Sequence, residues 1–158
     1  MTIIGVTGHQ SIPEVARQYI TDSLQQILSQ QPAPLIGVSS LAAGADQLFA
    51  YAILTAGGDL HAVIPSKHYE ETLSEVDRAS YFNLRNRATE IRILDYEAPS
   101  EEAFDAAGRT ITELCDIMIA IWDGEAARGQ GGTGDAVEHA RRNGKPVHII
   151  WPAGVTRD

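Results

Sequence analysis

Cysteine, aromatic residues and long apolar runs are all scarce in this sequence. A single cysteine, Cys115, cannot form a disulfide or a thiolate metal cluster within the chain, which indicates a reducing compartment. No window reaches the ~18 apolar residues of a membrane span, and residues 1–7 lack the basic segment of a secretory signal. These absences predict a cytoplasmic protein that does not cross a membrane.

Positively charged residues are also scarce. The chain has 12 Lys and Arg against 21 Asp and Glu, a formal net charge of −9. This is the wrong sign for a protein that binds phosphate backbones or anionic lipid surfaces. We therefore expect no binding of bulk nucleic acid and no membrane partner. An anionic ligand should be a small molecule held by backbone amides and a few cations.

Apolar residues are abundant enough for a core, at 44% of the 158 residues, so we expect a single domain over residues 1–158. Short β-rich runs alternate with helical patterns, which is typical of a parallel sheet with crossover helices. The sequence thus predicts an α/β, three-layer Rossmann-like domain with a mainly parallel sheet. The predicted strands are residues 3–7, 35–39, 60–64, 91–94, 117–122 and 147–151.

Helices and a long loop are also predicted from local signals. Ser11 and Glu14 have the spacing of a capping box at the start of the first helix, and the last helix should run from about Gly132 to Asn143. Residues 65–88 should form a loop followed by a helix. A loop of this length is suited to covering a site.

Glycines, hydroxyl groups and charged residues gather where the predicted strands end. Ligands of parallel α/β sheets bind outside the carboxyl ends of the strands, and the N–H groups at a helix start hold phosphate well. The candidate ligand-binding residues are therefore Thr7, Gly8, His9, Ser39, Gly44, Asp123, Gly131, Gly132, Thr133, Gly134 and Asp135.

Other binding motifs fit poorly. Residues 129–134 satisfy Gly-x-Gly-x-x-Gly, but they belong to the last βα unit and a loop separates them from their strand, so they do not indicate a dinucleotide site. The five histidines show no metal-ligand spacing. We expect neither a metal site nor a required cofactor.

Three segments together carry a family resemblance. They are residues 5–9 (Gly-Val-Thr-Gly-His), residues 37–46 with Ser39, Gly44 and Asp46, and residues 116–124 continued by 131–135. They resemble the SLOG superfamily of Rossmann-like nucleotide-binding domains, which includes the Lonely Guy (lysine decarboxylase-like) phosphoribohydrolases, molybdenum-cofactor carriers and nucleotide sensors. The resemblance spans nearly the whole chain and implies a nucleotide phosphate or ribose at the glycine-rich loop. It also implies a homodimer or a higher homo-oligomer.

Two ligand-binding functions remain open at this point, and a structural or regulatory partner domain with a vestigial pocket is a third possibility. As a sensor or carrier, the protein would bind a small nucleotide or nucleotide derivative unchanged. As a phosphoribohydrolase, it would cleave the N-glycosidic bond of a nucleoside 5′-monophosphate. Glu138 would assist the water or stabilise the oxocarbenium-like ribose, and an arginine would hold the phosphate. Arg109 is the candidate arginine, and Arg85 and Arg87 are the alternatives. The hydrolase pattern has Thr where this chain has Asp135, a carboxylate suited to ribose hydroxyls or a cation.

Overall fold

A parallel sheet forms the centre of the protein in the computed structural model, which describes residues 1–125 and 132–156. Its six strands have the order β4-β3-β2-β1-β5-β6, and every described pairing is parallel. Each strand end lies within one residue of its predicted position. The strands are β1 (Thr2–Gly8), β2 (Leu35–Ser39), β3 (Asp59–Ile64), β4 (Glu90–Ile93), β5 (Ile117–Ile121) and β6 (Val147–Ile150).

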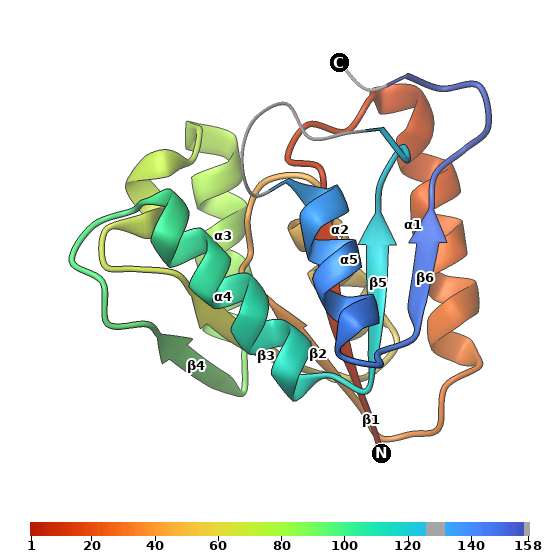
Figure 1. Ribbon diagram of the computed structural model, residues 1–158, viewed down its shortest axis with the longest axis horizontal. Coiled ribbons are helices and arrows are strands. Elements are labelled where there is room, and N and C mark those ends of the chain that lie inside the picture. Colours follow the sequence, from red (N-terminus) through yellow and green to blue (C-terminus); the bar gives the residue numbers. More distant parts are fainter. Residues whose placement is uncertain (126–131, 157–158) are drawn as a thin grey trace.

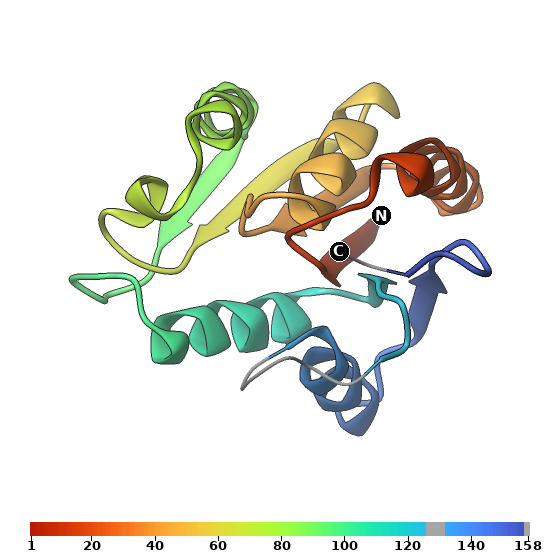
Figure 2. The same cartoon turned by 90° about the horizontal axis from the view of Figure 1, so that it is seen from above.

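Helices cover both faces of this sheet, as seen along the strands in Figure 2. One face carries α1 (Glu14–Ser29), α2 (Ala45–Thr55) and α3 (Glu75–Arg87), and the other carries α4 (Glu101–Leu114) and α5 (Thr133–Arg142) (Figure 1). A short 3-10 helix, η1 (Tyr69–Thr72), precedes α3. The predicted three-layer, Rossmann-like α/β fold is confirmed.

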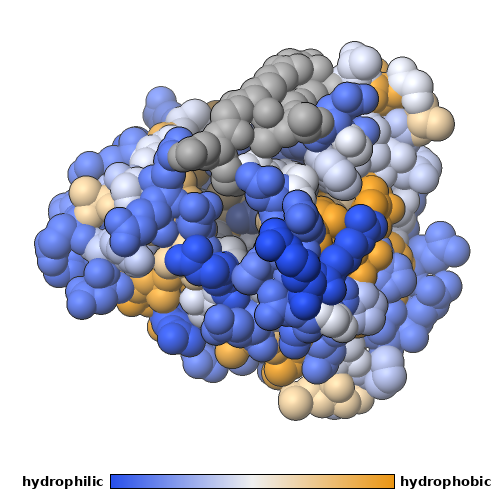
Figure 3. All heavy atoms as spheres, in the orientation of Figure 1, coloured by the Kyte–Doolittle hydropathy of each residue, from blue (hydrophilic) through white to orange (hydrophobic). Residues whose placement is uncertain are grey.

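The core explains why the central strands are continuous apolar runs. Ile4 of β1 and Ile119 of β5 are fully buried against α1 and α2, while Val38 and Met118 are buried on the face that α4 and α5 cover. Because helices cover both faces of the sheet, the central strands do not alternate between polar and apolar residues. The edge strands are more exposed, and an apolar area over β6, where Ile149 is 46% exposed, is visible beside α5 in Figure 3.

The start of the first helix differs from the prediction. The predicted capping box is wrong: α1 begins at Glu14 with Pro13 at its N-cap and has no side-chain cap. Pro13, whose φ is −56°, fixes the entry into the helix and moves its start beyond Ser11. The loop and helix predicted for residues 65–88 are confirmed as η1 and α3, and α5 lies within one residue of its prediction.

The strand order reverses direction at β1. The chain moves outward from β1 through β2 and β3 to β4, then crosses back to β5 on the other side of β1. Connections on opposite faces diverge at such a point and leave an opening at the carboxyl ends of the strands. Thr7 and Gly8 therefore lie at the position where this fold provides room for a ligand.

Candidate functional site

A cleft with two lobes lies beyond the carboxyl ends of the strands. One cavity of about 370 Å³ and a second of about 460 Å³ share Thr7, Phe104, Gly108, Thr112 and Ala136 as lining residues. Because they share one wall, we describe them as the apolar lobe and the polar lobe of one cleft. Their volumes fall in the range that holds small-molecule ligands.

Aromatic and aliphatic side chains line most of the apolar lobe. Tyr69 of η1 packs edge-on against Phe104 of α4 with ring centroids 6.0 Å apart, and Tyr69 also contacts the buried Tyr81 at 5.8 Å. Val6 and Met118 contribute further apolar lining from β1 and β5. A lobe of this kind suits a flat, largely apolar ring system.

Asp46, in the first turn of α2, places a carboxyl group in the apolar lobe. Its Oδ2 accepts a hydrogen bond from the backbone N–H of Ala42 at 3.2 Å. Burial raises the pKa of Asp46 from 3.8 to about 7, and the Ala42 hydrogen bond offsets only part of that effect. Burial and then the neighbouring Asp46 carboxylate raise the pKa of Tyr69. A perturbed carboxyl group in a cleft is a sign of function.

Ser39 and Gly44 build the turn that holds Asp46. The Ser39 hydroxyl accepts from Leu41 N at 3.0 Å and donates to the carbonyl oxygen of Asp46 at 3.2 Å. Gly44 has φ +74°, and a Cβ there would lie 2.5 Å from the carbonyl oxygen of Gln10. Neither residue lines the described cleft. Their contacts are those of structural supports, and direct ligand contact by either stays a prediction.

Charged groups and a helix start form the polar lobe. α4 contributes Asp105 and Arg109, and α5 contributes Asp135 and His139. Gly132 lines the lobe at the N-cap of α5 and has no side-chain cap. The first N–H groups of a helix lack intrahelical acceptors, so this end of α5 and the Arg109 guanidinium attract an anion, while the two carboxylates suit hydroxyl groups.

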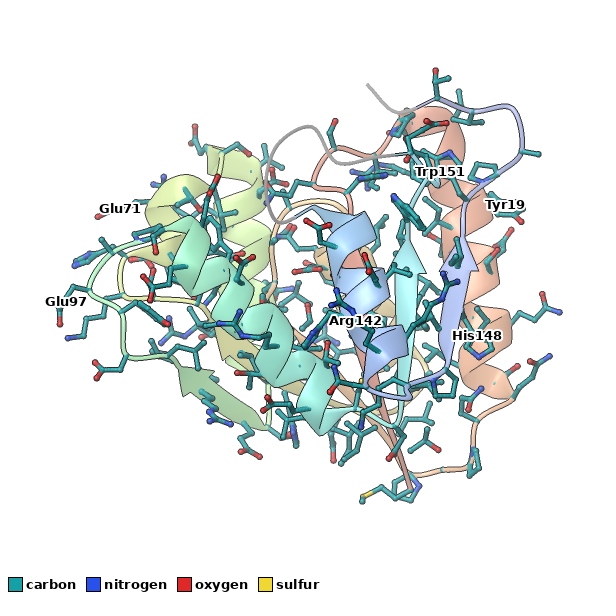
Figure 4. All side chains as sticks on the ribbon, viewed as in Figure 1. Tyr19, Glu71, Glu97, Arg142, His148 and Trp151 are labelled. Carbon is teal, nitrogen blue, oxygen red and sulfur yellow. The ribbon has the colours of Figure 1, made fainter. Side chains whose placement is uncertain are left out.

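His9 and Asp123 contact each other instead of lining the described cleft. The backbone N–H of Asp123 donates to Nε2 of His9 at 3.2 Å, and Asp123 Oδ1 lies 3.1 Å from the same nitrogen. Trp151 lies at the carboxyl end of β6 (Figure 4). It packs edge-on against the His9 ring with centroids 5.4 Å apart. We call His9, Asp123 and Trp151 the exit brace, because they tie together the ends of β1, β5 and β6.

The glycine-rich segment is divided between packing and lining roles. Gly134 packs against the Trp122 ring, since a Cβ at Gly134 would meet that ring at 3.3 Å. Thr133 is 8% exposed, and Gly132 and Asp135 line the polar lobe. The predicted ligand residue Gly131 lies outside the described residues.

The structure separates the two residues predicted for catalysis. Arg109 lines the polar lobe, and its role in holding phosphate stays a prediction. Glu138 is exposed on α5, lies 3.4 Å from Arg142, and is absent from the described lining of both lobes. A catalytic role for Glu138 therefore stays a prediction that the described geometry does not support.

Several lining residues were not singled out as site residues from the sequence. Asp46 belongs to the segment that carries the family resemblance and follows β2, so its position was a usable signal. Tyr69 lies in the long loop expected to cover a site, and the loop does contribute lining. Phe104 has the spacing of a core helix residue, and only the packing of α4 reveals that it faces the cleft.

Within residues 1–125 and 132–156, no group of three or more His, Cys, Asp or Glu side chains is placed to hold a metal ion. In the same part of the chain, none of the helices has the length and apolar character needed to span a bilayer.

The parallel sheet, its two helix layers and the cleft at the strand exits make a Rossmann-like α/β domain, the fold that the sequence resemblance implied. No protein-family model and no curated protein matches the chain. Several solved structures match the chain. DNA processing protein A from Streptococcus pneumoniae matches with a TM-score of 0.69 and 22% identity over 98% of this chain. The match covers 52% of that protein, so the chain spans about half its length.

Two further structures have the same fold. DNA processing protein A from Helicobacter pylori, described for its single-stranded DNA binding mode, matches with a TM-score of 0.71 and 16% identity over 99% of this chain and 68% of its own. The molybdenum cofactor binding protein from Rippkaea orientalis matches with a TM-score of 0.59 and 20% identity, covering 94% of this chain and 75% of its own. At these identities the likeness establishes the fold.

The comparisons correct the expectation that bulk nucleic acid is excluded. That expectation came from the net charge of −9, but a protein with the same fold binds single-stranded DNA. Net charge describes the long-range field of the whole chain, whereas a strand is bound by local amides, cations and stacking surfaces. The acidic composition does not decide between a free nucleotide and a nucleic acid strand.

Proposed function

We propose that this protein binds a nucleotide unit in the cleft, either as a free nucleoside 5′-monophosphate or as part of a single-stranded nucleic acid. The observation that carries the proposal is the division of one cleft into an apolar and a polar lobe that meet at Thr7. A nucleotide has the same division, because its base is flat and largely apolar and its phosphate is charged.

The phosphate belongs in the polar lobe. The start of α5 at Gly132 and the Arg109 side chain both favour an anion there. Asp135 and Asp105 repel a phosphate placed against them but accept hydrogen bonds from ribose hydroxyls. In this proposal the phosphate lies towards Arg109 and the α5 start, and the sugar lies between the lobes.

The base belongs in the apolar lobe, whose lining includes Tyr69, Phe104 and Met118. Stacking on aromatic rings contributes about 1–3 kcal/mol per base and tolerates any base. We do not extend the proposal to hydrolysis, because Glu138 points to Arg142 and not into the described cleft.

Titration calorimetry with the wild-type protein tests this proposal. The probes are 5′-nucleoside monophosphates, the matching nucleosides and a short single-stranded DNA. We expect monophosphates to bind more tightly than nucleosides, and Arg109→Gln to remove that advantage, a loss of about tenfold or more. Arg141→Gln on the exposed part of α5 is the matched control and should leave affinity unchanged.

The probes also distinguish the two sources of the nucleotide. Binding of monophosphates supports a free ligand, and binding of DNA alone, when it is weakened by Arg109→Gln, supports a strand. Absence of binding by every probe would contradict the proposal. Free base appearing during the incubation would show that the cleft also hydrolyses its ligand.

A further inference from the structure

Asp46 brings a charged group into the apolar lobe, where the proposed function places the base. A carboxylate is not needed to hold a stacked ring, and its burial is costly. The turn around it is nevertheless built to keep it there: Ser39 holds the backbone of Asp46, and Ala42 N donates to Oδ2. A buried carboxylate without a specific partner lowers the stability of the fold, so we expect Asp46 to have one.

Most of the other polar side chains in the described lining of this lobe are hydroxyls, with the amide of Gln10 beside them. Tyr69 is 3% exposed and lies close enough to Asp46 for the two to affect each other electrostatically. Ser40, at the exit of β2, is 9% exposed and also lines the lobe. The lobe therefore offers the two carboxylate oxygens of Asp46 beside hydroxyl groups that donate; Oδ2 already accepts from Ala42 N and can accept a second hydrogen bond.

These acceptors and donors are complementary to the hydrogen-bonding edge of guanine. Guanine presents a ring N1–H and a 2-amino group side by side, which match the two oxygens of a carboxylate, and next to them O6, which accepts from a hydroxyl. Adenine presents an unprotonated N1 at the same place, which a carboxylate repels. Hypoxanthine keeps N1–H and O6 but lacks the amino group.

We infer that Asp46 is the base-selecting residue of the cleft and that the preferred ligand carries a guanine-type edge, with adjacent ring N–H and amino donors held by the Asp46 carboxylate. Tyr69 completes the recognition by donating its hydroxyl to the ring oxygen. The inference rests on the proposed function, since it assigns the base of the nucleotide proposed above.

Comparative titration with GMP, IMP and AMP at about pH 8 tests the inference. The pKa of Asp46 is about 7, so its carboxyl group is mostly ionised under these conditions. We expect GMP to bind at least about tenfold more tightly than IMP, because IMP lacks one hydrogen bond to a charged group. AMP should bind most weakly of the three.

Two variants separate the roles in this recognition. Asp46→Asn keeps an oxygen for Ala42 N and should reduce GMP affinity to about that of IMP. Tyr69→Phe keeps the ring contacts with Phe104 and Tyr81 and should weaken GMP and IMP equally. Asp105→Asn, which removes a carboxylate from the polar lobe, is the matched control and should preserve the GMP preference. Thermal melting of each variant confirms that it folds.

The failures of the two proposals are distinguishable. Equal binding of GMP, IMP and AMP, or a GMP preference that survives Asp46→Asn in a folded protein, overturns the base assignment and leaves nucleotide binding intact. Neopterin carries the same edge without a phosphate. If neopterin binds, GMP does not, and Asp46→Asn abolishes the binding, the edge assignment stands and the ligand is a pterin instead of a nucleotide.

Discussion

On the β6 side of the strand-exit edge, His9, Asp123 and Trp151 contact one another in the exit brace. On the α4 side, Thr7 and Asp46 line an open cleft. Both regions follow parallel strands and contain the small, polar and charged residues expected of a ligand site. Small, polar and charged residues at a strand exit therefore do not by themselves indicate a ligand site. Joining loops to one another and binding a ligand both require hydrogen-bonding groups at close range.

Replacing Gly44 by Ala should give the largest effect on stability. We expect the free energy of unfolding to fall by roughly 4 kcal/mol, since a left-handed φ and a backbone overlap each cost about 1–3 kcal/mol. The overlap is with the carbonyl oxygens of His9 and Gln10. Urea denaturation measures the loss.

Gly57→Ala is the matched control, because Gly57 has φ +80° and no atom lies within 4 Å of the position that the added methyl group would take. Gly57→Ala should lower the free energy of unfolding by about 1 kcal/mol, which is the cost of the backbone conformation alone. Equal losses at Gly44 and Gly57 would show that the turn beside the brace is not tightly packed.

Asp46→Asn should change how stability depends on pH. The folded chain holds the Asp46 proton up to about pH 7, whereas the unfolded chain releases it near 3.8. Folded protein thus binds more protons within this window, so the free energy of unfolding falls as pH rises through it. The fall between about pH 5 and 8 should reach at most about 3 kcal/mol, reduced by the partial exposure of Asp46.

Urea denaturation across that pH range checks the effect. The Asn variant should show a flatter profile and be more stable than wild type at the alkaline end. Asp105→Asn, in the other lobe, should retain the slope of the wild type. A slope that is unchanged in Asp46→Asn would mean that the carboxyl group is well solvated in the cleft.

His9→Gln tests whether the exit brace is structural. We expect a loss of about 1–2 kcal/mol in stability, since the variant weakens the contacts with Asp123 and Trp151. Affinity for the best nucleotide probe should change by less than about threefold. Denaturation and titration calorimetry measure the two quantities separately. A large loss of affinity with little loss of stability would move His9 from the brace to the ligand site.

Glu138→Gln should have the smallest effect. Surface ion pairs contribute about 0–1 kcal/mol, and Glu138 faces Arg142 on the exposed side of α5. We expect unchanged nucleotide affinity in calorimetry and a melting temperature close to that of wild type. If Glu138→Gln instead abolished release of base from a monophosphate, the hydrolase role predicted from the sequence would be restored.

The fold was predictable because its signals are local and repeated. Runs such as residues 117–122 are apolar throughout, since helices bury both faces of β5, and the alternation with helical patterns specifies a parallel sheet. The failure at Ser11 has a local cause too: the spacing fits a capping box, but the conformation of Pro13 starts the helix later.

The candidate site was predictable only in part. Thr7, Gly8, Gly132, Asp135 and Arg109 do line the cleft. Ser39 and Gly44 are residue types that often bind ligands, but here they form the turn that holds Asp46. Sequence reasoning could not separate these groups, because the direction of a side chain at a strand exit depends on which loop packs beside it.

By itself, the sequence determined the order of strands and helices, the burial of the central strands and the edge of the sheet where a ligand would bind. These follow from periodicity and from the geometry of parallel strands, which act over a few residues. Only the tertiary structure brings His9 and Asp123 into contact and makes Tyr69, Phe104 and Asp46 line one lobe. Such contacts join residues far apart in the chain, and only packing brings their side chains together.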